Sequence, residues 1–283
     1  MNSDEVIRLT AFTEDPSGGN PAGVVLDATG MSDEQMLATA AEVGYSETAF
    51  LFPHKGSENS FQIRYFTPQA EVDFCGHATI ATGVALGREH GDGIFELTTN
   101  AGPVELDVTV VGNSVVATLT SPPATSSPLE AELVYDLLEA LDWDEEDLDT
   151  RFPPALGFVG NYHPILVADS RRRLADLDFD FDELGDLMRE NEWTTIQLVY
   201  PDEDDPHGRI WHSRNPAPGV GIYEDPATGS AAAAFGAYLR DRGIAGVGDH
   251  ITILQGDDMG RPSSIMLTIG GSSMKISGTA TDI

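Results

Sequence analysis

The sequence predicts an α+β protein of two similar domains, each a barrel-like, mainly antiparallel sheet around a central helix. Short runs rich in β-branched and aromatic residues, separated by Gly, Pro and Asn, recur along the whole chain, as in antiparallel sheets. Two helical segments, 75–90 and 224–239, consist mostly of small uncharged residues, and a helix that is apolar all round is normally buried. Sheets wrapped around these two segments would explain why neither has a continuous charged face.

Strand patterns occur in both halves of the chain. In the first half the expected strands are 6–12, 22–26, 48–52, 61–66, 94–99, 103–111 and 114–120. In the second half they are 155–159, 163–168, 195–200, 208–213, 250–255, 264–269 and 273–278. Three amphipathic helices are expected at 32–44, 129–141 and 181–190, and the first opens with a capping box of Ser32 and Gln35.

The segment SPPATSSP, residues 121–128, marks a boundary, because its prolines and serines fit a linker rather than a strand or helix. We therefore expect an N-terminal domain over 1–121, a linker over 122–128 and a C-terminal domain over 129–271. The strand-like segment 272–283 is a candidate addition to the N-terminal domain.

The two central helices begin alike. Cys75-Gly76-His77-Ala78 lies over Thr228-Gly229-Ser230-Ala231, so each helix has a glycine and a polar residue at its head. Each start follows a proline-containing strand end and an acidic approach, RYFTPQAEVDF in one half and WHSRNPAPGVGIYED in the other. This weak internal repeat predicts two pseudo-symmetric domains.

The composition is strongly acidic, with 47 Asp and Glu against 15 Lys and Arg and a formal net charge of −32. Such a charge argues against nucleic acid or an anionic membrane as a partner. It is typical of proteins from salt-rich cytoplasms, where salt screens the repulsion between the acidic side chains. No export signal or membrane-spanning apolar run is evident, and the single cysteine, Cys75, excludes an internal disulfide. We therefore expect a halophilic, cytoplasmic protein.

The starts of the central helices are candidate anion sites, because a helix start carries unpaired N–H groups and the positive end of the helix dipole. Gly76 and Gly229 would let a ligand come close to the backbone. If both starts face one cleft between the domains, they form a cradle for a small acid. The alternative is purely structural: Asp225 caps the second helix, Pro226 takes its first position, and the glycines pack.

Five motifs make a family resemblance specific, and together they extend over nearly the whole chain. They are NPAGVVL (20–26), YSETAFL (45–51), RYFTPQAEVDFCGHAT (64–79), GIYEDPATGSAAA (221–233) and LQGDDMGRPS (254–263). In this order they resemble the PhzF-like family, which is named for phenazine biosynthesis and is related in fold to diaminopimelate epimerase. The resemblance implies two similar α/β domains, a cofactor-independent active site between them, and a homodimer.

The resemblance also implies roles for individual residues. Glu47 matches the family's catalytic acid/base, and the other polar residues of the pocket are matched by His77, Asp225 and Ser230. Positions near bound substrate are matched by Asn20, Gly76 and Gly229. Each position also has a plainer interpretation, in which Glu47 is a solvated strand-end acid, His77 a packed first-turn residue and Ser230 a local hydrogen-bonding group.

These residue types fit a proton transfer. A partly desolvated carboxylate can take a proton from one carbon and return it to another, so that no metal or other cofactor is needed. The helix starts would stabilise the developing enolate, while Ser230 or His77 could relay the proton. We therefore expect a cofactor-independent isomerase or epimerase that moves a proton next to the carboxylate of a small acid metabolite.

Two other functions remain open. One is a non-catalytic protein that binds small carboxylates on the same fold. The other is a two-base amino-acid epimerase that uses Cys75, although Thr228 stands where diaminopimelate epimerase has its second cysteine. A nucleophilic Cys75–His77 pair is disfavoured, because residues two apart at a helix start are expected to point in different directions. No metal is expected, since the seven histidines lack ligand spacing, and the sequence does not identify the substrate.

Overall fold

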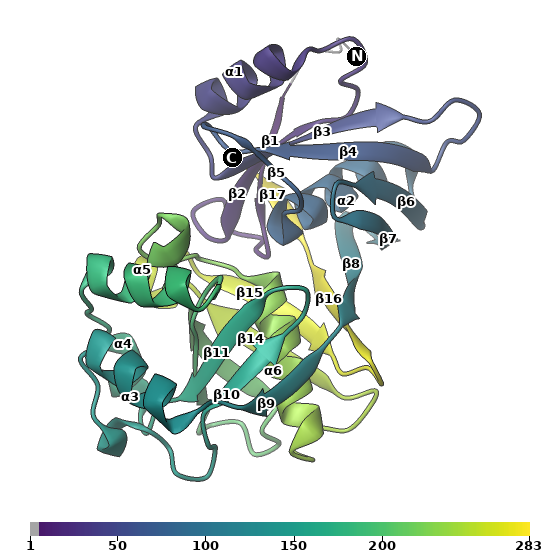
Figure 1. Ribbon diagram of the computed structural model, residues 1–283. Helices are drawn as coiled ribbons and strands as arrows, with labels where there is room; N and C mark the ends of the chain where they lie inside the picture. The colour runs from purple at the N-terminus through teal and green to yellow at the C-terminus, as the bar shows by residue number, and fades with distance from the viewer. Residues whose placement is uncertain (1–5) are drawn as a thin grey trace. The chain divides into compact units, whose positions relative to one another are not determined.

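The computed structural model describes residues 6–283, so the first five residues of the predicted N-terminal domain lie outside the described part (Figure 1). The chain forms two compact units. Unit 1 takes the chain up to Thr120 together with Ser277–Ile283, and unit 2 is Ser121–Ile276. The chain passes from unit 1 to unit 2 within strand β8, Ser114–Pro123, and returns within strand β16, Ser273–Gly278.

Unit 1 is a strongly bent sheet with two helices. Its remaining strands are β1 Ile7–Ala11, β2 Asn20–Val25, β3 Glu47–Pro53, β4 Ser60–Phe66, β5 Glu71–Val72, β6 Gly93–Thr99, β7 Gly102–Val111 and β17 Ala280–Asp282. Neighbouring strands pair antiparallel, except that β2–β3 and β4–β6 are parallel. The helices are α1, Asp33–Val43, and α2, Gly76–His90.

Helix α2 is the axis of unit 1. Its residues from His77 to Gly87 are all buried, and it contacts β1, β2, β3, β6, β7 and β17. Glycine allows this close packing, since a Cβ at Gly83 would lie 2.6 Å from the Cβ of Ala117. The prediction of a sheet around a buried helix without a continuous charged face is therefore confirmed for this half of the chain.

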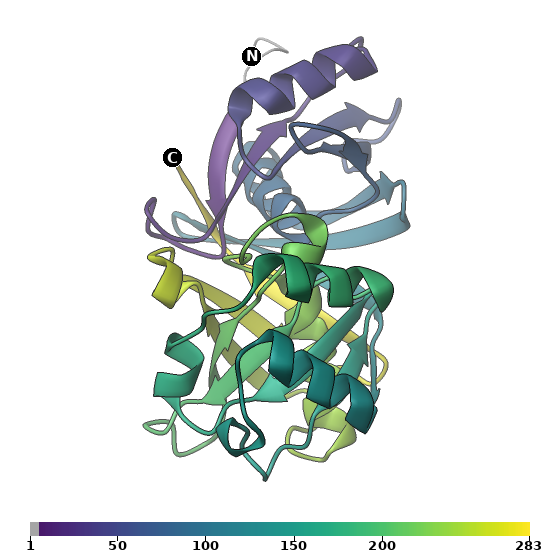
Figure 2. The same ribbon diagram turned by 60° about the vertical axis from the view of Figure 1, so that its left-hand side comes forward.

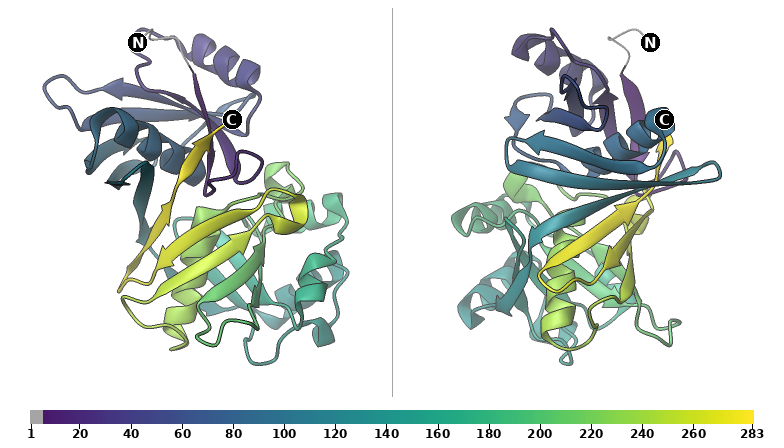
Figure 3. Two further views of the ribbon diagram at one scale, coloured as in Figure 1. Left: turned by 180° about the vertical axis from the view of Figure 1, so that it is seen from behind. Right: turned by 90° about the vertical axis from the view of Figure 1, so that its right-hand side faces the viewer.

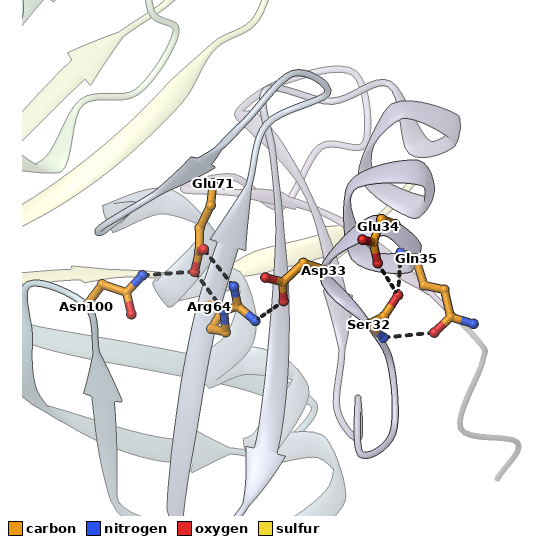
Figure 4. A network of polar contacts seen from close by, with 7 residues as sticks. All are labelled: Ser32, Asp33, Glu34, Gln35, Arg64, Glu71 and Asn100. Carbon is orange, nitrogen blue, oxygen red and sulfur yellow. Dashed lines mark hydrogen bonds and ion pairs between the residues drawn. The ribbon is translucent and has the colours of Figure 1, made fainter.

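Helix α1 covers the outside of unit 1 and starts as predicted. The Ser32 side chain accepts from the Gln35 amide, and the Gln35 side chain accepts from the Ser32 amide, which completes the capping box (Figure 4). Its apolar side packs on β3 and β4, where Met36 and Ala40 meet Phe50.

Unit 2 has the same plan with more helices. Its remaining strands are β9 Thr125–Pro128, β10 Ala155–Phe158, β11 Tyr162–Val167, β12 Gln197–Pro201, β13 Ile210–Arg214, β14 His250–Gln255 and β15 Ser263–Thr268. Its helices are α3 Ala131–Ala140, α4 Arg171–Ala175, α5 Phe181–Glu190 and α6 Gly229–Asp241. Helices α3, α4 and α5 lie together on the outside of the unit, over a core that includes Trp143 and Trp193 (Figure 2). Helix α6 is the axis, with Ala231 to Leu239 all buried against β9, β10, β11, β12 and β15.

The two units repeat one pattern of strand pairing. In unit 1 the pairs β1–β2, β2–β3, β3–β4, β4–β6 and β6–β7 alternate antiparallel and parallel, and in unit 2 the pairs from β10–β11 to β14–β15 do the same. In chain order, the buried helix comes between the two strands of the second parallel pair in both units. Strand β17 pairs with β1 as β9 pairs with β10 (Figure 3). The α+β class and the mainly antiparallel, pseudo-symmetric plan are confirmed.

The segment 122–128 is not an irregular linker. Strand β8 continues to Pro123, and β9 pairs with β10, with Ser126 opposite Gly157 and Ser127 opposite Leu156. Proline lacks an N–H for a sheet, but Pro123 and Pro128 stand at strand ends, where the two serines between them can still pair. The prolines that indicated a linker therefore mark the ends of strands β8 and β9.

Candidate active site

Both central helices begin at the glycine that the sequence repeat predicts. Cys75 is the N-cap residue of α2 and Thr228 that of α6, so Gly76 aligns with Gly229 and His77 with Ser230. Neither N-cap side chain accepts a hydrogen bond from its helix, which leaves the first-turn amides to other partners or a ligand.

In unit 1 the helix start brings two predicted site residues, Glu47 and His77, together. Glu47 is the first residue of β3 and lies beside Ala22 of β2, while His77 occupies the first turn of α2. The Glu47 Oε2 atom is 3.2 Å from His77 Nε2, and their side chains are 20% and 9% exposed. This distance suits an ion contact, yet Oε2 is a buried atom without a geometrically acceptable hydrogen bond among the described residues. Glu47 is thus a half-buried carboxylate beside an imidazole, and its Oε2 atom has a lone pair that can accept a proton.

Cys75 lies against the same imidazole, which corrects the expectation that the two side chains diverge. Its Sγ atom is 3.4 Å from Nδ1 and 3.7 Å from Nε2 of His77. The reason is that Cys75 is an N-cap residue with extended backbone angles, φ −144° and ψ 115°, so helical spacing does not apply to it. The His77 Nε2 atom is also 3.3 Å from the hydroxyl of Ser46.

Two substrate-binding positions were predicted for unit 1: Gly76 lies between Cys75 and His77 in the chain, and Asn20 lies two residues before Ala22, which pairs with Glu47. Asn20 opens β2, is 2% exposed, and lies opposite Ala11 of β1. Gly76 faces open space, since an added Cβ would meet nothing nearer than the Phe74 ring at 4.0 Å. A ligand can therefore reach the backbone at Gly76 without a side chain in its way.

In unit 2 Asp225 belongs to a tight turn ahead of α6 rather than to the helix. The Thr228 hydroxyl donates to Asp225 Oδ2 at 2.5 Å, so the expectation that Asp225 is the N-cap and Pro226 the first helical residue is wrong. The helix begins later because this hydrogen bond and Gln255 close the turn first. The Gln255 side chain donates to the Asp225 carbonyl at 2.7 Å and accepts from the Thr228 amide at 3.1 Å.

Gln255 is a positioning residue that the sequence interpretation missed. It lies in the motif LQGDDMGRPS, which supported the resemblance but received no role. The next residue, Gly256, has φ 80°, and a Cβ there would lie 2.8 Å from the Pro226 carbonyl oxygen. The predicted residues Gly229 and Ser230 follow this turn as the first two residues of α6, and both are half-buried.

An Arg–Glu ion pair holds the approach to each helix start. In unit 1, Arg64 binds Glu71 through Nε at 2.7 Å and Nη2 at 2.6 Å, and it also reaches Asp33 at 2.7 Å (Figure 4). In unit 2, Arg214 binds Glu224 in the same way, at 2.9 and 2.5 Å. Hydrogen bonds from Arg64 lower the pKa of Glu71. An acidic residue ahead of each central helix therefore has a structural role, because it pairs with an arginine of the preceding strand. The sequence signal for these ion pairs was an arginine at the same strand position in each half.

A buried polar network is hydrogen-bonded to the Asp225 turn through Asn215. His163 is fully buried, and its Nδ1 lies 2.9 Å from the Thr195 hydroxyl, which donates to Asn215 Oδ1 at 2.8 Å. The Asn215 side chain in turn donates to the Gln197 side chain at 2.8 Å. The backbone carbonyl of Asn215 accepts from the Asp225 amide at 3.0 Å. Burial lowers the pKa of His163 to about 4, so this imidazole is neutral at neutral pH.

The repeat shows which site groups are unique to one unit. The strand pairs that contain Arg64 and Arg214 place Thr195 of unit 2 where Glu47 stands in unit 1. At the helix starts Thr228 stands in the place of Cys75. The carboxylate and the thiol of unit 1 therefore have hydroxyl groups as their counterparts in unit 2.

Two α+β units of one topology, each with polar side chains at the start of its buried helix, define an epimerase-like fold. The chain belongs to the PhzC-PhzF family of phenazine biosynthesis-like proteins, whose model matches residues 9–283. None of the helices within residues 6–283 is long and apolar enough to cross a membrane.

Individual relatives agree with this assignment. The protein YfhB of Bacillus subtilis, described as an uncharacterized isomerase, is 31% identical over 293 residues, which cover 100% of this chain and 97% of YfhB. The trans-2,3-dihydro-3-hydroxyanthranilate isomerase of Pseudomonas chlororaphis is 32% identical over 260 residues, covering 91% of this chain and 87% of that enzyme. The crystal structure of a Bacillus anthracis phenazine biosynthesis protein of the PhzF family superimposes with a TM-score of 0.86 at 25% identity, covering 98% and 96% of the two chains. The predicted family, fold class and enzyme class are confirmed.

Proposed function

We propose that this isomerase moves a proton at a carbon next to the carboxylate of a small acid, with Glu47 as the single acid/base and no cofactor. The observation that carries this proposal is the Glu47 Oε2 atom, which is buried, lies in ion contact 3.2 Å from His77 Nε2 and accepts no hydrogen bond of acceptable geometry from the described residues. A lone pair of this kind can accept a proton from carbon, and the adjacent imidazole can steady the charge or relay the proton.

The asymmetry of the repeat supports one base rather than two. A two-base epimerase of the thiol type needs a second cysteine, but Thr228 is the N-cap residue of α6 where Cys75 is that of α2. Thr195 likewise stands in the place of Glu47, and a hydroxyl is far too weak a base for this role. A base that takes a proton from one carbon and returns it to another needs no partner on the opposite side of the substrate.

We propose that the helix start of unit 2 is a binding site for a carboxylate. The Asp225 turn is fixed by Gln255 and by the Asn215 carbonyl, and the first-turn amides after Thr228 are not capped by its side chain. Amide groups at a helix start bind anions well, and Gly229 and Ser230 are the residues that supply them here. The Pseudomonas chlororaphis relative, a trans-2,3-dihydro-3-hydroxyanthranilate isomerase, is also named for an acid as its substrate.

Deuterium exchange tests the proposal directly. Small amino and hydroxy acids are incubated with the enzyme in D₂O at molar KCl, and proton NMR follows deuterium entering next to the carboxylate. Glu47→Gln keeps the side-chain shape but removes basicity, so exchange should fall by about 10²–10⁴ while calorimetric binding persists. The matched control is Glu42→Gln, the same change at an exposed position of α1.

The outcomes separate the alternatives. Exchange at the wild-type rate in Glu47→Gln would mean that Glu47 is not the base. Binding without exchange in the wild-type protein would favour a non-catalytic carboxylate binder.

We also propose the homodimer expected for the family, and sedimentation in molar KCl measures it.

A further inference from the structure

Glu47, Cys75 and His77 together offer three different metal ligands. One carboxylate oxygen, the thiol sulfur and one ring nitrogen all lie within 4.8 Å of one another. Within residues 6–283 this is the one group of three acidic, thiol or imidazole side chains so closely set. The sequence did not indicate it, because Cys75 and His77 were expected to diverge and Glu47 is distant in the chain.

The separations between the ligand atoms suit a small tetrahedral ion. Zn²⁺ binds sulfur at about 2.3 Å and imidazole nitrogen or carboxylate oxygen at about 2.0–2.1 Å, so neighbouring ligand atoms are about 3.3–3.6 Å apart. In this cluster His77 Nε2 lies 3.2 Å from Glu47 Oε2 and 3.7 Å from Cys75 Sγ. The Glu47 oxygen and Cys75 Sγ lie within 4.8 Å of each other, so side-chain rotations that bring them to the same spacing would place the three atoms around one ion.

The chemistry of the ligands favours a soft divalent cation. A thiolate and an imidazole select zinc-like ions over Mg²⁺ or Ca²⁺, which prefer oxygen. The buried Glu47 Oε2 atom accepts no hydrogen bond from the described residues, so coordination replaces only its 3.2 Å contact with His77, which is itself a ligand. The positive end of the α2 dipole opposes a cation, but this effect is small beside direct coordination by two anionic ligands.

We propose that Glu47, Cys75 and His77 form a site for Zn²⁺ or a similar thiophilic cation, and that the bound ion inhibits the isomerase. Inhibition follows because the ion takes the carboxylate lone pair that would accept the substrate proton. The inhibition rests on the proposed role of Glu47, whereas the binding does not.

Binding is measured without reference to activity. Because Cys75 is the only cysteine, a thiolate-to-metal charge-transfer band on adding Cd²⁺ to the chelator-treated protein reports this site alone. Calorimetry with Zn²⁺ should show one site per chain, weakened at least tenfold by Glu47→Gln and by His77→Asn. His90→Asn, at an exposed position of the same helix, and Glu42→Gln are the matched controls and should bind Zn²⁺ as the wild type does.

Two results would overturn the site. One is the absence of a Cd²⁺ band. The other is a band with unchanged Zn²⁺ affinity in both Glu47→Gln and His77→Asn, which would indicate capture by the thiol alone.

Inhibition is tested separately, with deuterium exchange measured with and without Zn²⁺. Zn²⁺ should suppress exchange in the wild type, and Cys75→Ser should lose most of this sensitivity relative to its own metal-free rate. Zn²⁺ binding without inhibition would overturn the inhibitory role. If Glu47→Gln exchanges normally while still weakening Zn²⁺ binding, the proposed function fails and the metal site stands.

Discussion

Replacing Glu224 by Gln should destabilise the protein far more than the same replacement of Glu71, although both residues accept the same two bonds from an arginine. In unit 2 the side chains of Arg214 and Glu224 are 8% and 2% exposed. Losing the carboxylate leaves a buried guanidinium charge without a counter-ion, which typically costs about 3–5 kcal/mol. The Gln amide oxygen can still accept one hydrogen bond, so we expect about 3 kcal/mol for Glu224→Gln.

The unit 1 pair provides the matched comparison. Arg64 and Glu71 are 18% and 28% exposed, and Arg64 keeps a second acidic partner, Asp33, at 2.7 Å. Solvent screening and this second partner reduce the expected cost of Glu71→Gln to about 1 kcal/mol.

The assay is urea unfolding in molar KCl, in which general self-repulsion is screened. All three tryptophans, Trp143, Trp193 and Trp211, belong to unit 2, so intrinsic fluorescence follows that unit alone and circular dichroism follows the whole chain. Glu224→Gln should shift the fluorescence transition to lower urea, whereas Glu71→Gln should shift it little. Equal losses in the two variants would refute the link between burial of the pair and its energy.

Three further outcomes are expected. With a net charge of −32 the melting temperature should rise steeply between dilute buffer and molar KCl, and equal values would contradict the halophilic interpretation. Unfolded His163 binds a proton near pH 6.5 but the folded residue only near pH 4, so the wild type should lose up to about 3 kcal/mol as the pH falls between these values. His163→Gln should show a flatter pH profile of unfolding in this window, and an unchanged slope would assign the effect to other groups. Cys75→Ser should keep most of the metal-free exchange rate, since the thiol is not the proposed base, and a loss of several orders of magnitude with the fold intact would restore a thiol mechanism.

Local signals in the sequence predicted most of the fold. The β-branched and aromatic runs at 61–66 and 250–255 form β4 and β14, and the capping box at Ser32 formed as expected. One element that depends on a distant partner was missed. Strand β9 is short and lacks a pattern of its own, and it is a strand because β10 pairs with it.

The candidate site shows the same division. The repeat at the helix starts gave the correct register for Gly76 and Gly229, because a run of small residues needs no knowledge of tertiary structure. The contact of Cys75 with His77 depends on the extended backbone of an N-cap residue, and the role of Gln255 depends on a strand that reaches the Asp225 turn from 30 residues away. Neither could be derived from spacing alone.

The return of the chain to unit 1 sets the order in which the protein can mature during synthesis. Unit 2 is one continuous stretch, but strand β1 needs β17, and the Phe12 amide needs the Thr279 carbonyl at 2.8 Å. Unit 1 therefore leaves the ribosome first and is completed last, after all of unit 2 has been translated. Until then the β17 side of β1 is an unpaired strand edge, and a nascent chain halted before residue 277 would carry it exposed.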